Sequence, residues 1–221
     1  MYTDGDPDLF LQAYREGIFP MADTADALFY NFYRPDMRGQ LSIEELHIPK
    51  KLRKTVRHFP YKVTINQDFE GVIAECAKEG GKGRETTWIN DTIRNVFIKL
   101  HKKGKAHSVE CWQDDKLVGG LYGLAIGKVY CGESMFSRAT DASKIALVHL
   151  AARLWKAGFT ILDTQFINDH LSQFGAYEIP QEDYEDLIET EMRRCADFTL
   201  KNKFPDITED ELVLEYLAAR C

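Results

Sequence analysis

The sequence predicts an α/β (α+β) fold in which helices flank a mixed, largely antiparallel sheet. Three segments place apolar residues at relative positions 0, 3, 4 and 7, the spacing of a helix with one buried face. Four short apolar runs read as strands, and three of them follow one another closely enough to form a meander. The chain has 221 residues, 44% of them hydrophobic, which is enough to bury a sizeable core.

The N-terminal segment predicts a small subdomain. A short amphipathic helix is expected over residues 8–16, followed by an irregular aromatic stretch over 29–33. Pro35 and Gly39 then indicate a boundary. We therefore expect a subdomain over residues 1–40, ahead of a main domain over residues 41–183.

Three core helices follow from the apolar spacing. Their stripes are Phe69, Val72, Ile73 and Cys76; Ile93, Val96, Phe97 and Leu100; and Leu147, Leu150, Ala151 and Leu154. Capping residues support the helix limits: Asn90 or Asp91, and Asp141 or Ser143, stand where N-caps belong, and Gly104 and Gly158 stand where C-terminal glycines belong.

The predicted strands lie at 108–112, 117–121, 129–131 and 160–166. The first three form a central antiparallel meander, which suits an N-acetyltransferase-like (GNAT) layout. The last residues, 184–221, are rich in Glu and Asp and are expected to form an acidic, mainly helical tail.

Composition excludes several classes of protein. A net charge of -7 argues against broad basic contact with nucleic acid, since phosphate affinity comes from Lys and Arg. Two basic clusters, around 50–58 and 99–105, provide either a local contact with nucleic acid or ordinary solvated surface. Five cysteines without CxxC spacing and no recognisable signal peptide before the first helix favour the cytoplasm, and no apolar run is long enough to span a membrane.

Familiar catalytic motifs are missing. The six histidines have no metal-ligand spacing, so we expect no metal site. Ser134 lacks the second glycine of a nucleophile elbow. The glycine-rich loop at 80–83 lacks Walker spacing and reads as a flexible connection more readily than as a phosphate cradle.

A pair of polar residues on one strand is the strongest candidate for chemistry. Strand alternation points Asp163 and Gln165 to the same face, and their apolar neighbours indicate a buried strand. A buried Asp and Gln need hydrogen-bond partners, in a functional site or in a merely structural network. Glu133, at the exit of another predicted strand, is the third candidate.

Several separate motifs resemble those of one enzyme family. They are AYREGIFP at 13–20, HSVECWQ at 107–113, LVGGLYG at 117–123, CGESMFS at 131–137 and DTQ at 163–165. In this order and spacing, over roughly residues 5–183, the chain resembles the leucyl/phenylalanyl-tRNA-protein transferases, bacterial enzymes that place Leu or Phe on protein N-termini.

The resemblance implies an aminoacyltransferase that uses aminoacyl-tRNA as co-substrate and needs no cofactor. It would act on the N-terminal amine of proteins beginning with Arg or Lys and so mark them for degradation, and a monomer is the simplest expectation. Gln165 would accept a hydrogen bond from the attacking amine and Asp163 would hold Gln165, with its role as a base left open. Glu133 would lie near the acceptor's basic side chain or brace the site.

The resemblance also implies a substrate-binding set around the donor amino acid. It consists of an apolar pocket formed by Trp88, Leu121, Tyr130 and Leu150, together with Phe32, Tyr33 and Ser134. Taken alone, each apolar member could equally be a core residue.

Some positions depart from the family pattern. Met21 and Phe32–Tyr33 stand where tryptophans are usual, and Arg34 adds a positive charge where a hydroxyl is expected. Donor choice, including a donor such as Arg-tRNA, therefore stays open. An acyl-CoA N-acyltransferase lacks support because no pyrophosphate-binding turn is present, and a non-catalytic binder of protein N-termini is the alternative from a different class.

Overall fold

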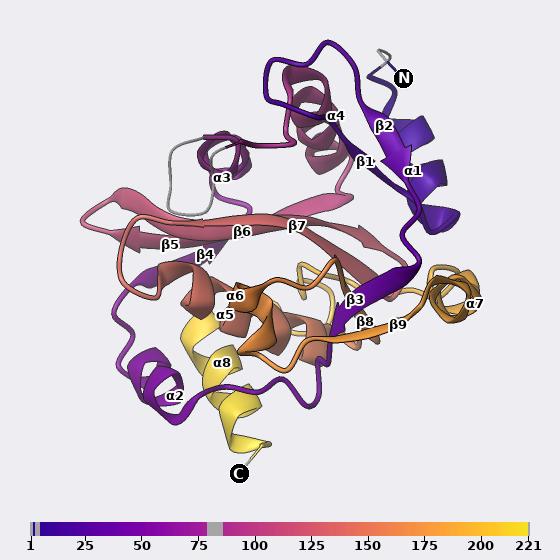
Figure 1. The fold of residues 1–221 in the computed structure, drawn as a ribbon. Coiled ribbons are helices and arrows are strands. Elements are labelled where there is room, and N and C mark those ends of the chain that lie inside the picture. The colour runs from indigo at the N-terminus through magenta and orange to yellow at the C-terminus, as the bar shows by residue number, and fades with distance from the viewer. Residues whose placement is uncertain (1, 3–4, 79–85, 221) are drawn as a thin grey trace.

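The computed structural model describes residues 2, 5–78 and 86–220, so the loop at 80–83 lies outside the described residues. Within them, a seven-stranded sheet forms the centre of the molecule (Figure 1). In order across the sheet, its strands are β4 (Lys62–Ile65), β5 (Ala106–Gln113), β6 (Lys116–Ile126), β7 (Val129–Ser137), β8 (Ile161–Gln165), β3 (Met37–Leu41) and β9 (Tyr177–Pro180). Among the described strand pairs of this sheet, β7 and β8 alone run parallel. The predicted mixed, largely antiparallel sheet is confirmed.

The meander β5–β6–β7 is longer than its sequence pattern predicted. Asp114 and Asp115 both have positive φ, which closes a two-residue hairpin turn. Glycines let β6 continue where side chains would collide: a Cβ on Gly119 would lie 2.4 Å from Cβ of Ala142, and one on Gly123 would lie 2.4 Å from the carbonyl oxygen of Cys131. The predicted strand at 117–121 already includes Gly119 but stops before Gly123, which has no side chain to continue the pattern, whereas β6 itself runs on to Ile126.

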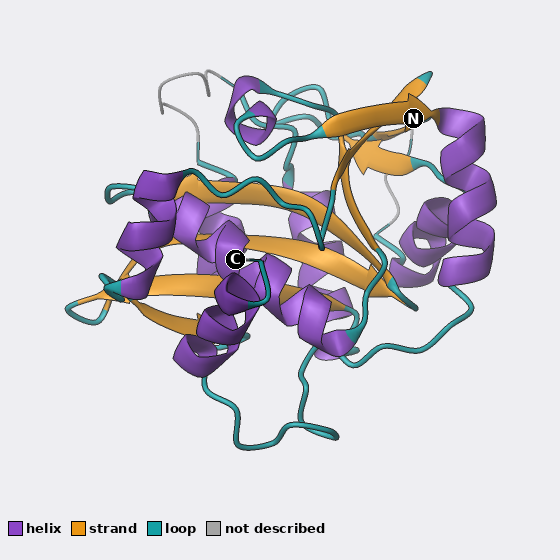
Figure 2. Ribbon diagram, turned by 90° about the horizontal axis from the view of Figure 1, so that it is seen from below, coloured by secondary structure: helices purple, strands orange, loops and turns teal. Residues whose placement is uncertain are grey.

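Helices cover both faces of the sheet (Figures 1 and 2). The helices are α1 (Pro7–Arg15), α2 (Lys50–Arg57), α3 (Phe69–Cys76), α4 (Asp91–Lys102), α5 (Ala142–Ala157), α6 (Asp169–Ser172), α7 (Gln181–Glu191) and α8 (Glu209–Ala218). One hydrophobic cluster joins the sheet to α1, α3, α4 and α7, and another joins it to α2, α5 and α8. The three predicted stripes are buried in α3, α4 and α5.

The predicted helix limits have a local physical basis. Asn90 is the N-cap of α4, and its Oδ1 accepts a hydrogen bond of 2.9 Å from the backbone N of Ile93. Asp141 occupies the N-cap position of α5 in a left-handed conformation without a capping bond from its side chain. Gly158 ends α5 with φ 77°, a conformation that glycine adopts without strain.

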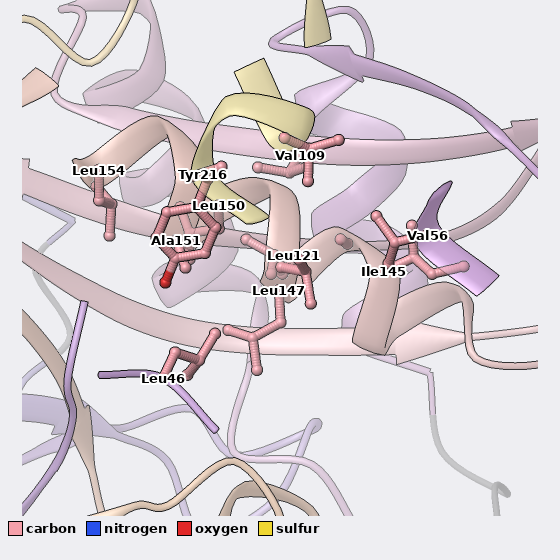
Figure 3. Packing of buried hydrophobic residues seen from close by; sticks show 14 of the residues in the cluster. Leu46, Val56, Val109, Leu121, Ile145, Leu147, Leu150, Ala151, Leu154 and Tyr216 are labelled. Atoms are coloured by element: carbon pink, nitrogen blue, oxygen red, sulfur yellow. The ribbon is translucent and has the colours of Figure 1, made fainter. Parts of the chain in front are cut away.

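The two ends of the chain pack against helices that cover the main sheet, α1 against α4 and α8 against α5. The N-terminal part holds α1 and the antiparallel pair β1 (Phe19–Met21) and β2 (Asn31–Tyr33). Helix α8 packs on α5 (Figure 3), and the hydroxyl of Tyr216 donates to the carbonyl oxygen of Ile43 at 2.5 Å. Strand β3 runs across residue 40, where the boundary between the two domains was expected. The expected domain limits stay predictions.

Candidate functional site

A pocket opens where two strands of the sheet separate. Strands β7 and β8 pair only from Val129–Ile161 to Cys131–Asp163. Beyond that point β7 stays paired with β6, while β8 ends at Gln165. The space between them is a cavity of about 940 Å³. Of the predicted site residues, those that line it are Trp88, Leu121, Glu133, Ser134, Leu150 and Gln165.

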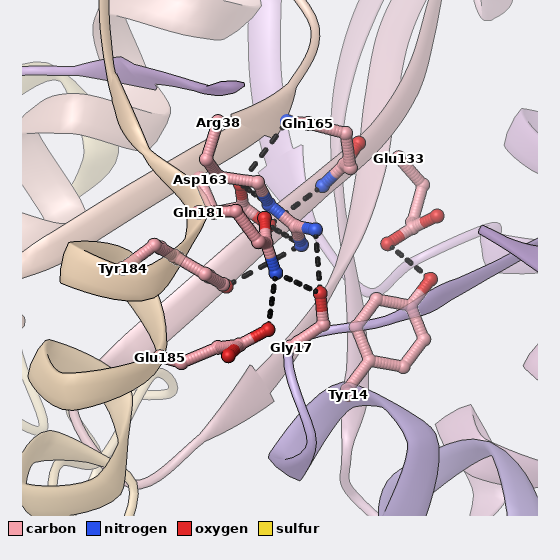
Figure 4. A network of polar contacts seen from close by, with 9 residues as sticks. All are labelled: Tyr14, Gly17, Arg38, Glu133, Asp163, Gln165, Gln181, Tyr184 and Glu185. Atoms are coloured by element: carbon pink, nitrogen blue, oxygen red, sulfur yellow. Dashed lines mark hydrogen bonds and ion pairs between the residues drawn. The ribbon is translucent and has the colours of Figure 1, made fainter. Parts of the chain in front are cut away.

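Asp163 and Gln165 meet as the strand alternation predicted. The side-chain Nε2 of Gln165 donates to Oδ2 of Asp163 at 2.9 Å, and the backbone N of Gln165 donates to Oδ1 at 3.1 Å (Figure 4). Gln165 has φ 58°, which is uncommon for a residue with a side chain, and these two bonds hold it there. Asp163 is fully buried, whereas Gln165 reaches the pocket.

Arg38, which the sequence analysis gave no role, is the partner of Asp163. Its Nε and Nη2 donate to Oδ1 and Oδ2 of Asp163 at 2.8 and 2.7 Å. Both side chains are fully buried. Burial opposes the charge of Arg38, but the adjacent Asp163 carboxylate holds the pKa of the guanidinium above its usual range. The sequence contained one indication of such a partner: a buried, charged Asp needs a cation beside it.

Glu133 lies across the pocket and is held by the N-terminal helix. The hydroxyl of Tyr14, in α1, donates to Oε1 of Glu133 at 2.8 Å (Figure 4). Burial raises the pKa of the Glu133 carboxyl from 4.5 to about 8, and Asp163 adds to this, while Tyr14 and Arg38 oppose it. Glu133 therefore holds its proton more readily than an exposed glutamate.

The predicted donor pocket is brought together in part. Trp88, Leu121 and Leu150 line the cavity. Tyr130 does not reach its wall: the tyrosine is fully buried, its hydroxyl donates to the carbonyl oxygen of His107, and its ring stacks on Phe198. A role for Tyr130 in donor binding stays a prediction, without direct pocket contact to support it.

The aromatic positions of β2 lie beside the pocket. The ring of Phe32 packs edge-on against Tyr2, Phe10 and Tyr30. Tyr33 is exposed and stacks on Phe19, which lines the cavity together with Met21. Phe32 and Tyr33 pair with Pro20 and Phe19 of β1, which line the cavity, so they lie beside the pocket without lining it.

Arg34 turns away from the pocket. Its Nε and Nη2 donate to the two carboxylate oxygens of Glu185, in α7, at 2.7 and 2.9 Å. Its side chain is 47% exposed, and it does not line the cavity. The extra charge at this position is therefore neutralised outside the pocket.

Neither a metal site nor a membrane span was found in the described part of the chain. No three or more His, Cys, Asp or Glu side chains there are grouped so that they could hold a metal ion. No helix formed by the residues that the structure describes is long and apolar enough to cross a membrane.

Comparison with known proteins places the chain in a family. Residues 40–189 match the leucyl/phenylalanyl-tRNA protein transferase family, and residues 4–36 match the N-terminal domain of the same family. The chain belongs to the leucyl/phenylalanyl-tRNA protein transferase family. The resemblance predicted from the sequence motifs is confirmed.

Relatives of the same name cover most of the chain. A leucyl/phenylalanyl-tRNA–protein transferase of Rhodopseudomonas palustris (strain TIE-1) is 49% identical over 192 residues, spanning 87% of this chain and 85% of that protein. The transferase of Phenylobacterium zucineum is 47% identical over 188 residues, spanning 85% of both chains. That of Hyphomonas neptunium is 49% identical over 192 residues, spanning 87% of this chain and 74% of that protein.

Proposed function

We propose that this member of the transferase family moves leucine or phenylalanine from aminoacyl-tRNA to the N-terminal amine of proteins that begin with Arg or Lys. The modified proteins would be marked for degradation, and the enzyme would work as a monomer in the cytoplasm. The observation that carries the proposal is the oriented Gln165 amide at the wall of an apolar pocket, opposite an acidic side chain.

Gln165 is suited to receive the acceptor amine. Asp163 accepts a hydrogen bond from the amide NH₂ of Gln165, and this bond fixes the direction in which the amide oxygen Oε1 points. No residue described in the structure donates a hydrogen bond to this oxygen, and in Figure 4 it points to the side where Glu133 lies. An approaching amine N–H would find a preoriented acceptor there.

The transfer itself needs little further chemistry because the aminoacyl ester is already activated. The amine nitrogen attacks the ester carbonyl carbon, the C–N bond forms, and the C–O bond to the terminal ribose breaks. The proton lost by the amine leaves with the ribose oxygen, which becomes a hydroxyl group. Since a neutral amide is a poor base, Gln165 orients the amine and does not keep the proton.

Glu133 is placed to recognise the basic side chain of the acceptor. Its carboxyl lines the same pocket as Gln165. Its raised pKa means that a bound guanidinium or ammonium group would favour release of its proton and create an ion pair in a partly desolvated site. This accounts for a preference for Arg or Lys at the acceptor terminus.

The donor side chain fits the apolar wall, and the tRNA body fits a basic surface elsewhere. Trp88, Leu121 and Leu150 offer an apolar surface for leucine or phenylalanine. The groove of about 1100 Å³ along α2 is lined by more cationic side chains, among them Lys50 and Lys54, than acidic ones, Glu44 and Glu45. Such a local cluster can neutralise phosphates on a protein whose net charge is negative.

The test is transfer of radiolabelled amino acid from Leu-tRNA, Phe-tRNA and Arg-tRNA to a protein with an N-terminal Arg. We expect transfer of leucine or phenylalanine and a fall of about 100-fold in kcat for Gln165→Ala, since orientation is lost. Gln113→Ala, which removes an exposed glutamine at the end of β5, is the matched control and should retain wild-type activity.

A lack of transfer from every charged tRNA would refute the proposal, provided that an established transferase uses the same tRNA and acceptor. Binding of the acceptor without transfer would then point to a non-catalytic binder of protein N-termini.

A further inference from the structure

We infer that Arg38 is the positioning residue of this site: it engages the carboxylate of Asp163 so that Asp163 orients Gln165 and takes no proton during transfer. The inference rests on the proposed function and assigns a role to a side chain that does not line the pocket. It also decides whether Asp163 acts as a base.

The hydrogen bonds of Asp163 leave no place for a proton from the substrate. Oδ1 accepts from Arg38 Nε at 2.8 Å and from the backbone N of Gln165 at 3.1 Å. Oδ2 accepts from Arg38 Nη2 at 2.7 Å and from Gln165 Nε2 at 2.9 Å. A carboxylate offers about four acceptor sites, and these four bonds occupy them. Asp163 therefore acts through Gln165 and not on the amine.

The shape of the guanidinium matters as much as its charge. Two parallel N–H···O bonds fix the plane of the Asp163 carboxylate, and that plane sets the direction in which the Gln165 amide points. The Arg38 guanidinium itself is held between two rings, with its central carbon 4.8 Å from the centroid of Phe19 and 4.3 Å from that of Tyr184. A lysine would keep the charge but would lose the planar fork.

A third bond ties the same guanidinium to the N-terminal part of the chain. Nη1 of Arg38 donates to the carbonyl oxygen of Gly17 at 2.9 Å, and Nε2 of Gln181 donates to the same oxygen at 2.9 Å (Figure 4). Gly17 has φ 75°, and a Cβ there would lie 2.8 Å from Cγ of Glu185 and 2.9 Å from Nε2 of Gln181, so the turn accepts only glycine without strain.

This third bond links the two groups proposed to handle the acceptor. The Gly17 turn directly follows α1, and α1 carries Tyr14, which holds Glu133. Arg38 thus fixes Gln165 through Asp163 and fixes the end of α1 through Gly17. The guanidinium of Arg38 helps to set the distance between the amine site and the side-chain site, together with Gln181, which bonds the same Gly17 oxygen.

The test compares Arg38→Lys with a matched control, Arg34→Lys, which alters a two-bond Arg–carboxylate pair of the same kind on the surface. We measure kcat, the KM for aminoacyl-tRNA, the KM for an N-terminal Arg peptide, and thermal unfolding. The expected result for Arg38→Lys is a fall in kcat of about 100-fold, with the KM for aminoacyl-tRNA within about threefold of wild type. Arg34→Lys should leave kcat within about twofold.

A second pair of variants covers the case in which Arg38→Lys does not fold. Asp163→Asn leaves the buried Arg38 charge without its partner carboxylate, whereas the double variant Arg38→Met/Asp163→Asn buries no charge at either position. If Arg38 acts through Asp163, the double variant should lose no more than about threefold in kcat beyond Asp163→Asn alone, because the two effects are not additive.

Each outcome decides the inference. Wild-type kcat in folded Arg38→Lys, a defect confined to KM, or multiplied losses in the double variant would overturn it while leaving the proposed function standing. An inactive wild type, with competent tRNA and acceptor, would overturn the proposed function and this inference with it.

Discussion

Replacing Glu133 with glutamine is expected to remove a pH-dependent loss of stability. Burial raises the pKa of Glu133 from 4.5 to about 8 in the folded protein, so the native state retains a proton that the unfolded chain has released. The associated stability is fully present below pH 4.5 and is lost as the pH rises toward 8. Glutamine mimics the neutral carboxyl and has no such dependence.

The magnitude is clearest between pH 6.5 and 8. One pKa unit corresponds to about 1.4 kcal/mol, and allowing for partial ionisation near pH 8, Glu133 should cost the wild type roughly 1.5 kcal/mol across this interval. Burial lowers the pKa of His107 and His149 from 6.5 to about 3, so these histidines add stability as the pH rises and the gain levels off only above pH 6.5. Because wild type and Glu133→Gln both contain the two histidines, this contribution cancels in the difference between their free energies of unfolding.

The assay is urea unfolding of wild type and Glu133→Gln at three pH values in this interval. The wild-type free energy of unfolding should fall relative to that of the variant as the pH rises. Glu75→Gln is the matched control. Burial would raise the pKa of Glu75, but hydrogen bonds and ion pairs with Lys78 and Arg138 outweigh it and lower the pKa. Glu75 is therefore fully ionised throughout the interval, and its replacement should add no pH dependence. Parallel curves for wild type and Glu133→Gln would refute the assignment of a raised pKa to Glu133.

Three further predictions test the core, the donor pocket and the basic groove. Leu212→Ala, in the fully buried face of α8, should lower the free energy of unfolding by about 2–5 kcal/mol, measured by urea denaturation. Trp88→Ala should raise the KM for Leu-tRNA by about tenfold through lost apolar contact, measured by steady-state transfer. Lys54→Gln should reduce the slope of log affinity for tRNA against log salt by about one, and Lys201→Gln, an exposed lysine outside α2, should leave it unchanged.

Local patterns were sufficient for much of the fold. Apolar spacing predicted α3 and α4 because each buries one stripe, and it predicted α5 although that helix is buried on nearly all sides between the sheet and α8. Strand alternation was also sufficient to place Asp163 and Gln165 together, since residues two apart on a strand share a face. The predicted strands were too short where glycines of β6 interrupt the side-chain pattern.

Contacts between distant segments were beyond the reach of local patterns. Arg38 and Asp163 are 125 residues apart in sequence, and Tyr14 and Glu133 are 119 apart. Strand β3 brings the first pair together by pairing with β8, and the position of α1 brings the second. The residues around Asp163 indicate that it needs a cationic partner, but the residues around either pair do not show which distant side chain the partner is.

Tyr130 shows the same limit on a single strand. Its alternation in β7 is visible in the sequence, but which face of β7 borders the pocket depends on where β8 separates from it. The ring lies instead against Phe198, in a segment that the sequence set outside the main domain.

The sequence by itself determined the family, the secondary structure of the main helices and the Asp163–Gln165 pair, because motif order, periodicity and alternation are properties of neighbouring residues. Only the tertiary structure decided the partner of Asp163, the support of Glu133 and the members of the pocket wall. Those depend on sheet order and on the point at which β7 and β8 part, which arise from packing across the whole chain.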